Sequence, residues 1–214
     1  MDRIKMISRT LMVVLAFVIV GLLIKHKKNI SPPEPPYDPT TSTLQRPDID
    51  FGKVGDFEFT ERSGKKITQE DLKGKISIVD FVFTRCMGPC PLMTKKMSDF
   101  SKEFLHKSNL QFISLSVDPD FDTPQVLTKY AQTYNADPQK WLFLTGNREK
   151  IYHLVETSFK LLVEGDDIPK DGIDILHSTM FVLVNGEGKI LGYYNTADSD
   201  QMKELKKRVE KLAI

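Results

Sequence analysis

Apolar and polar residues follow two distinct rhythms between residues 56 and 212. Short blocks rich in β-branched and aromatic residues predict strands, and longer blocks with apolar residues three or four positions apart predict helices. The predicted strands cover residues 56–60, a short stretch around Lys66, and residues 75–83, 111–117, 141–144, 178–184 and 189–194. The predicted helices cover residues 91–106, 124–134, 148–159 and 199–212.

The order of these elements predicts an α/β fold of the thioredoxin-like kind. The first two strands flank a turn at Ser63–Gly64 and are expected to form an N-terminal β-hairpin. A strand, a helix, a strand and a helix follow, and the chain closes with a hairpin and a last helix. In this architecture the loop between the first core strand and the first long helix holds a dithiol. Cys86 and Cys90 fall in that loop.

The first thirty residues differ from the rest of the chain. Residues Leu11 to Ile24 form an apolar run with basic residues on both sides. At about 1.5 Å per residue the run is short for a bilayer core of about 30 Å, but neighbouring apolar residues can extend it. We expect residues 1–30 to form a single uncleaved membrane-spanning helix, because no small-residue cleavage site follows. A cleaved signal peptide and a buried helix are the alternatives.

The next segment, residues 31–47, is rich in proline. Six of the twelve prolines fall between residues 32 and 47, so this stretch can form neither a helix nor a central strand. A semi-stiff spacer and an unstructured leader both fit it. The folded domain is then expected over residues 48–214, outside the cytoplasm. A bacterial inner membrane is the simplest setting, because the N-terminus lacks a Ser- and Arg-rich transit segment.

The charge balance excludes one class of partner. The chain has 30 Lys and Arg against 29 Asp and Glu, which gives a formal net charge of +1. Nucleic-acid binding rests on an excess of basic side chains. No nucleic-acid partner is therefore expected.

Cys86 and Cys90 are the two cysteines of the chain, within the stretch TRCMGPCP. Residues at i and i+4 lie on one face of a helix with α-carbons roughly 6 Å apart, so their sulfurs can join in a disulfide or bind one soft metal ion. A helix N-terminus stabilises a thiolate, which predicts a lowered pKa and reactivity rather than burial. A purely structural disulfide is disfavoured because it would close a very small loop. Two thiolates suit Cu(I).

One of the four histidines stands out as a possible third ligand. His26, His106 and His153 are expected at the membrane flank, a helix end and a helix. His177 directly precedes the predicted strand STMFVLV, in a loop expected to face the dithiol. Structural zinc usually needs four ligands, which this set supplies poorly. The pattern alone leaves open whether His177 binds a metal.

Three sequence blocks resemble the SCO/SenC family: FTRCMGPCP, SVDPDFDTP and HSTMFVLVNGEGKI, in this order. The resemblance spans about residues 50–212 and implies a thioredoxin-like fold. It also implies a membrane-tethered copper protein that serves assembly of the CuA centre of cytochrome c oxidase. By the same resemblance Cys86, Cys90 and His177 would be the copper ligands. The partner would be an oxidase subunit or another copper or thiol protein.

The chain departs from the family pattern around these ligands. Met87-Gly88-Pro89 replaces a common Pro-Asp-x between the cysteines. Arg85 stands where the family often has histidine, Leu176 where it often has aspartate, and Phe121 where it often has arginine. The three expected ligands are intact. These departures leave open whether copper delivery or thiol reduction is the main activity.

Two alternatives to a metallochaperone follow from the same residues. A thiol:disulfide oxidoreductase would use one cysteine to attack a partner disulfide and the other to resolve the mixed disulfide. A peroxidase is disfavoured, because the Pro-x3-Thr-x2-Cys motif is absent before Cys86. The acidic residues Asp118, Asp120 and Asp122 are expected to shape a turn and a helix start rather than hold a metal. Asp80 either tunes a thiol pKa or pairs with a basic residue.

Overall fold

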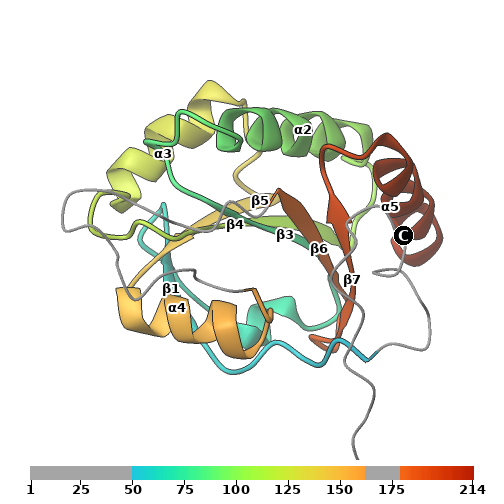
Figure 1. Ribbon diagram of the computed structural model, residues 1–214, viewed down its shortest axis with the longest axis horizontal. Helices are drawn as coiled ribbons and strands as arrows, with labels where there is room; N and C mark the ends of the chain where they lie inside the picture. The colour runs from blue at the N-terminus through green and yellow to red at the C-terminus, as the bar shows by residue number, and fades with distance from the viewer. Residues whose placement is uncertain (1–49, 162–178) are drawn as a thin grey trace, which may run out of the picture. The chain divides into compact units, whose positions relative to one another are not determined.

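The computed structural model describes residues 50–161 and 179–214, and its centre is a seven-stranded sheet (Figure 1). The strand order is β2-β1-β5-β4-β3-β6-β7. β3 is parallel to β4, β4 is parallel to β5, and β6 pairs antiparallel with both β3 and β7. The strand bounds are Glu58–Glu61 for β1, Lys66–Thr68 for β2, Ile76–Val82 for β3, Leu110–Ser116 for β4, Trp141–Thr145 for β5, Met180–Val184 for β6 and Ile190–Asn195 for β7.

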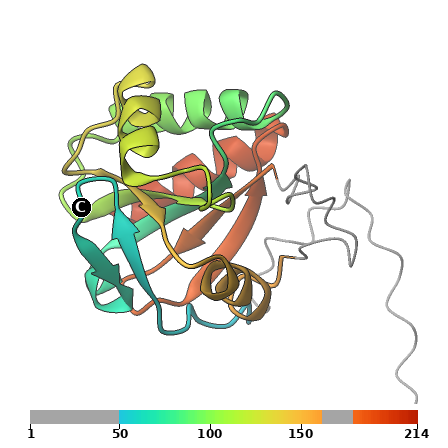
Figure 2. The same cartoon turned by 90° about the vertical axis from the view of Figure 1, so that its left-hand side faces the viewer.

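Helices cover both faces of the sheet (Figure 1 and Figure 2). The helices α2, α3 and α5 lie along one face, and α4 lies on the other. Their bounds are Cys90–Glu103 for α2, Pro124–Thr133 for α3, Arg148–Thr157 for α4 and Ser199–Leu212 for α5. Two apolar cores result, one on each face. This layering confirms the predicted thioredoxin-like α/β class.

The central strand β3 carries the chain to the site. All seven of its residues are buried, as expected for a strand with neighbours on both sides and helices on both faces. Ile78 points into the core under α2, and Val79 points into the core under α4. β3 therefore fixes the start of the following loop from both faces.

Local capping fixes where the helices begin. The Thr123 hydroxyl accepts a hydrogen bond from Val126 N, and Pro124 is the first residue of α3, as the sequence predicts. The Asn147 side chain caps α4 in the same way, and the Asp198 side chain caps α5.

The predicted elements are found, with ends that differ by up to three residues and one turn that was not predicted. The hairpin is present, because β1 and β2 pair antiparallel with Phe59 opposite Ile67. The first long helix ends at Glu103 instead of His106, because Phe104 closes it with hydrogen bonds to Phe100 and Lys102. The same helix begins at Cys90, one residue earlier than predicted. A short 3-10 turn, η2 (Gln69–Leu72), was not predicted.

The predicted anchor, residues 1–30, and the predicted linker, residues 31–47, lie outside the described residues. Within residues 50–161 and 179–214, every helix is too short or too polar to cross a bilayer.

Candidate functional site

The two cysteines lie together where β3 leads into α2. Cys86 lies in the loop before the helix, and Cys90 is the first helical residue. Both are free thiols, and they are only 7% and 4% exposed. The expectation that both share a helix face is wrong, because Cys86 precedes the helix. The two thiols are nevertheless close enough to influence each other electrostatically.

Short backbone contacts shape the loop between the cysteines. Cys86 N donates to Phe83 O at 3.1 Å, and Gly88 N donates to Cys86 Sγ at 3.4 Å. Pro89 precedes the helix, and Met93 N donates to Pro89 O at 3.0 Å. The proline restricts the backbone directly before the first turn, where Cys90 begins the helix.

The environment of Cys90 disfavours its thiolate. Burial raises the pKa of Cys90 to about 12, and nearby Cys86 and Asp80 add to the increase. The backbone N–H of Phe83 opposes this effect without cancelling it. The expectations of a lowered pKa and an exposed thiol are therefore wrong for Cys90, because desolvation outweighs the helix N-terminus. Cys90 is protonated at neutral pH until a cation or a reaction partner arrives.

Asp80 is a buried carboxyl group on β3, close enough to influence Cys90 electrostatically. Neither carboxylate oxygen makes a hydrogen bond of ordinary geometry within residues 50–161 and 179–214. Its neighbour in the β3–β4 ladder is Ser114, whose hydroxyl accepts a hydrogen bond from Trp141 Nε1 at 2.9 Å. Burial raises the pKa of Asp80 to about 7, and Ser114 offsets only part of this effect. Of the two sequence interpretations, pairing with Lys or Arg is therefore not found within residues 50–161 and 179–214.

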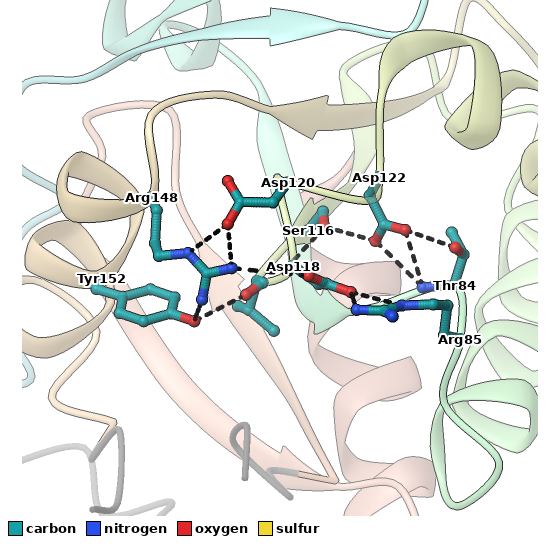
Figure 3. A network of polar contacts seen from close by, with 9 residues as sticks. Thr84, Arg85, Ser116, Asp118, Asp120, Asp122, Arg148 and Tyr152 are labelled. Carbon is teal, nitrogen blue, oxygen red and sulfur yellow. Dashed lines mark hydrogen bonds and ion pairs between the residues drawn. The ribbon is translucent and has the colours of Figure 1, made fainter. Parts of the chain in front are cut away.

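An ion-pair network holds the residue before Cys86 (Figure 3). Arg85 donates from Nε and Nη2 to Asp118 Oδ2, at 3.0 and 2.7 Å. The Asp118 side chain is only 3% exposed, so this charge-assisted pair is partly desolvated. Arg148 donates to Asp120 Oδ2 at 3.1 and 2.5 Å, and its Nη2 lies 3.9 Å from Asp118 Oδ1. The network joins the dithiol loop to α4 through the loop after β4.

Asp122 holds the same loop from a second side. It accepts hydrogen bonds from Thr84 N at 3.1 Å, from Thr84 Oγ1 at 2.5 Å and from Ser116 Oγ at 2.6 Å (Figure 3). Burial raises the pKa of Asp122, and these donors counter that effect. The acidic residues around Asp122 therefore build structure, as the sequence indicated. In the part of the chain that the structure describes, no three His, Cys, Asp or Glu side chains are grouped to hold a metal.

Two departures from the family pattern touch each other. The Arg85 guanidinium carbon lies 4.4 Å from the centroid of the Phe121 ring, a cation–π contact. The arginine next to Cys86 is therefore held against the loop after β4 by both Phe121 and Asp118. Sequence reasoning noted both residues but had no signal that they meet.

The candidate third ligand is not described by the structure. His177 lies outside the described residues, as does His26. His106 and His153 are exposed, in agreement with the surface and helix positions predicted for them. The structure therefore brings Cys86 and Cys90 together, and His177 stays a prediction.

The sheet, its helices and the paired thiols define a thioredoxin-like dithiol protein. The SCO1/SenC family matches residues 47–213 of the sequence. The chain belongs to the SCO1/SenC family.

Three relatives show how far the similarity reaches. The SCO1 protein homolog of Bacillus subtilis (strain 168) is 36% identical over 152 residues, which cover 69% of this chain and 76% of the relative. The structure of BsSco, described as a Sco-family cytochrome c oxidase assembly protein with a disulfide switch, is 34% identical with a TM-score of 0.61, and covers 72% of this chain and 91% of its own. Yeast Sco1 with copper bound is 27% identical with a TM-score of 0.61, over 74% and 87% of the two chains.

Proposed function

We propose that this protein is a membrane-tethered copper metallochaperone for assembly of the CuA centre of cytochrome c oxidase. The observation that carries the proposal is the pair of free, adjacent thiols at the start of α2. The membership of the protein in the SCO1/SenC family supports the proposal. A yeast relative with copper bound and a relative described as a cytochrome c oxidase assembly protein support it too.

Cys86, Cys90 and His177 are the proposed ligands, and copper is the cargo. Two neighbouring thiolates suit Cu(I), which accepts soft ligands and few of them. Each thiol must lose its proton to bind, and the raised pKa of Cys90 opposes that loss. The charge of the bound ion supplies the missing stabilisation of the thiolate. Binding is therefore expected to release protons and to strengthen with pH.

The ion leaves by ligand exchange. Thiolates of the acceptor, an oxidase subunit or another copper or thiol protein, replace the two cysteines one at a time. Residues 1–30 would hold the chain in the inner membrane, with the folded domain on the extracytoplasmic side. This arrangement would keep the dithiol near a membrane-bound acceptor.

Thiol:disulfide exchange is the second candidate, and the short separation of the two thiols favours it. One thiolate attacks a partner disulfide and forms a mixed disulfide, and the other cysteine displaces the partner. The partner disulfide gains two electrons and becomes two thiols, while Cys86 and Cys90 become a disulfide. His177 contributes no bond to this reaction.

The experiment compares Cu(I) affinity and disulfide reduction in the same variants of the full chain in detergent micelles. Reduced protein is titrated with Cu(I) against a competing chelator. Because one ligand is lost, His177→Ala should weaken binding about 10- to 100-fold, while the exposed-histidine control His153→Ala should not. Weak binding by the wild type, or equal affinity in both variants, would contradict the three-ligand site. Unimpaired disulfide reduction by such a wild type would then favour the oxidoreductase.

A further inference from the structure

Met87 stands between the two cysteines with its side chain in solvent. It is 99% exposed, whereas Cys86 and Cys90 are 7% and 4% exposed. Met93 and Met97, one and two turns into α2, are buried in the core at 2% and 0%. A methionine that packs against nothing gives the fold no stabilisation. Its sulfur is therefore accessible to an ion that arrives from solvent.

The two thiols are poorly placed to meet an arriving ion. Both are almost fully covered by protein, so little of either sulfur faces the solvent. A cation that approaches from water first reaches the exposed part of the loop. There the neighbouring residues on either side of Met87 are Cys86 itself and Gly88, whose N–H donates to Cys86 Sγ.

A thioether is the ligand that this position can use. Methionine sulfur is soft and neutral, so it binds Cu(I) without first losing a proton. Its side chain is unbranched with three rotatable bonds, so it can sweep a wide volume. Consecutive α-carbons are about 3.8 Å apart, so the Met87 side chain starts directly beside that of Cys86.

We propose that Met87 is the entry ligand for Cu(I), and that it passes the ion to Cys86 and Cys90. This inference rests on the proposed function. The bond between copper and the molecule that delivers it breaks as the bond between copper and the Met87 sulfur forms. The bond to Met87 then breaks as the bonds to the cysteine sulfurs form. Copper stays Cu(I) throughout, and each thiol that binds releases its proton to solvent.

The test measures how fast the reduced full chain, in detergent micelles, takes Cu(I) from its bicinchoninate complex. Stopped-flow absorbance follows the loss of the coloured complex, and a separate titration gives the equilibrium affinity. Met87→Leu keeps the size and apolar character of the side chain and removes only the sulfur. Met202→Leu on α5 is the matched control, because it makes the same chemical change away from the dithiol. The helix α5 contacts the far end of α2 through the ion pair of Lys206 with Glu103.

Met87→Leu should slow the transfer about tenfold, as expected for the loss of one ligand, and leave the equilibrium affinity within about twofold. Met202→Leu should change neither quantity. A wild-type transfer rate in Met87→Leu would overturn the inference and leave Met87 as an exposed loop residue without a role in copper uptake. Equal slowing in both variants, or a loss of affinity in Met87→Leu as large as in Cys86→Ser, would overturn it too. If the wild-type protein binds no copper at equilibrium, the proposed function itself is wrong. The titration distinguishes this result from a failure of the Met87 inference alone.

Discussion

Replacing Asp80 by asparagine tests the electrostatics beneath the dithiol. Asp80 is fully buried on β3, and neither of its oxygens has a hydrogen bond of ordinary geometry within residues 50–161 and 179–214. Asparagine has nearly the same shape but cannot ionise. The difference between the two proteins therefore isolates the cost of the buried charge.

The size and sign of the effect follow from the raised pKa. Burial moves the pKa of Asp80 from 3.8 to about 7, so the folded protein holds this proton more tightly than the unfolded chain. Asp80 therefore costs no stability below pH 4, where it is protonated in both states. The free energy of unfolding decreases as pH rises through 7. A shift of about three pH units corresponds to about 4 kcal/mol at roughly 1.4 kcal/mol per unit. Asp80→Asn removes this loss, and any cost of the amide itself is independent of pH.

Urea unfolding of the reduced protein at several pH values from 4 to 8 measures the effect. The single tryptophan, Trp141, is fully buried and reports the transition by its fluorescence. The free energy of unfolding of Asp80→Asn, relative to wild type, should rise by about 4 kcal/mol from pH 4 to pH 8. Asp56→Asn, at an exposed aspartate, is the control and should show no such trend. A difference that stays constant with pH would refute the reasoning.

Three further predictions concern the same domain. Iodoacetamide should alkylate Cys90 at pH 8 at least about tenfold more slowly than free cysteine, because the thiolate is the nucleophile and its pKa is about 12; equal rates by mass spectrometry would contradict this. Asp118→Ala leaves Arg85 without its buried acceptor and should lower the free energy of unfolding by about 2 kcal/mol; an unchanged denaturation midpoint would mean that the network adds no stability. Leu127→Ala in the core should cost about 2–5 kcal/mol, and Leu92→Ala, at a 61% exposed position, less than about 1 kcal/mol; similar costs would contradict the assigned burial.

The fold was predictable because each element has a local signal. The seven-residue strand β3 is apolar or β-branched almost throughout, and Thr123 with Pro124 marks a helix start that the structure confirms. The thiol pair was predictable for the same reason, since its spacing and its place after a strand are both local. Ends of elements were less certain, as Phe104 shows, because backbone hydrogen bonds decide them.

The chemistry of the site was less predictable than its position. A helix N-terminus suggested a reactive Cys90, but burial decides its pKa, and burial comes from tertiary packing. The contact between Arg85 and Phe121 joins residues 36 positions apart and has no signature in either segment. Among the residues that the structure describes, Asp80 has no hydrogen-bond partner of ordinary geometry. A strand pattern could not predict this, because it depends on what β4 and α2 place around Asp80.

X-ray absorption at the copper K edge of the Cu(I)-loaded full chain tests the central claim most directly. It counts the sulfur and nitrogen atoms bound to the metal in the wild type, in Cys86→Ser and in His177→Ala. We predict two sulfurs and one imidazole nitrogen in the wild type, one sulfur fewer in Cys86→Ser, and no imidazole in His177→Ala. Copper bound without sulfur, or the same ligand set in all three proteins, would contradict the account.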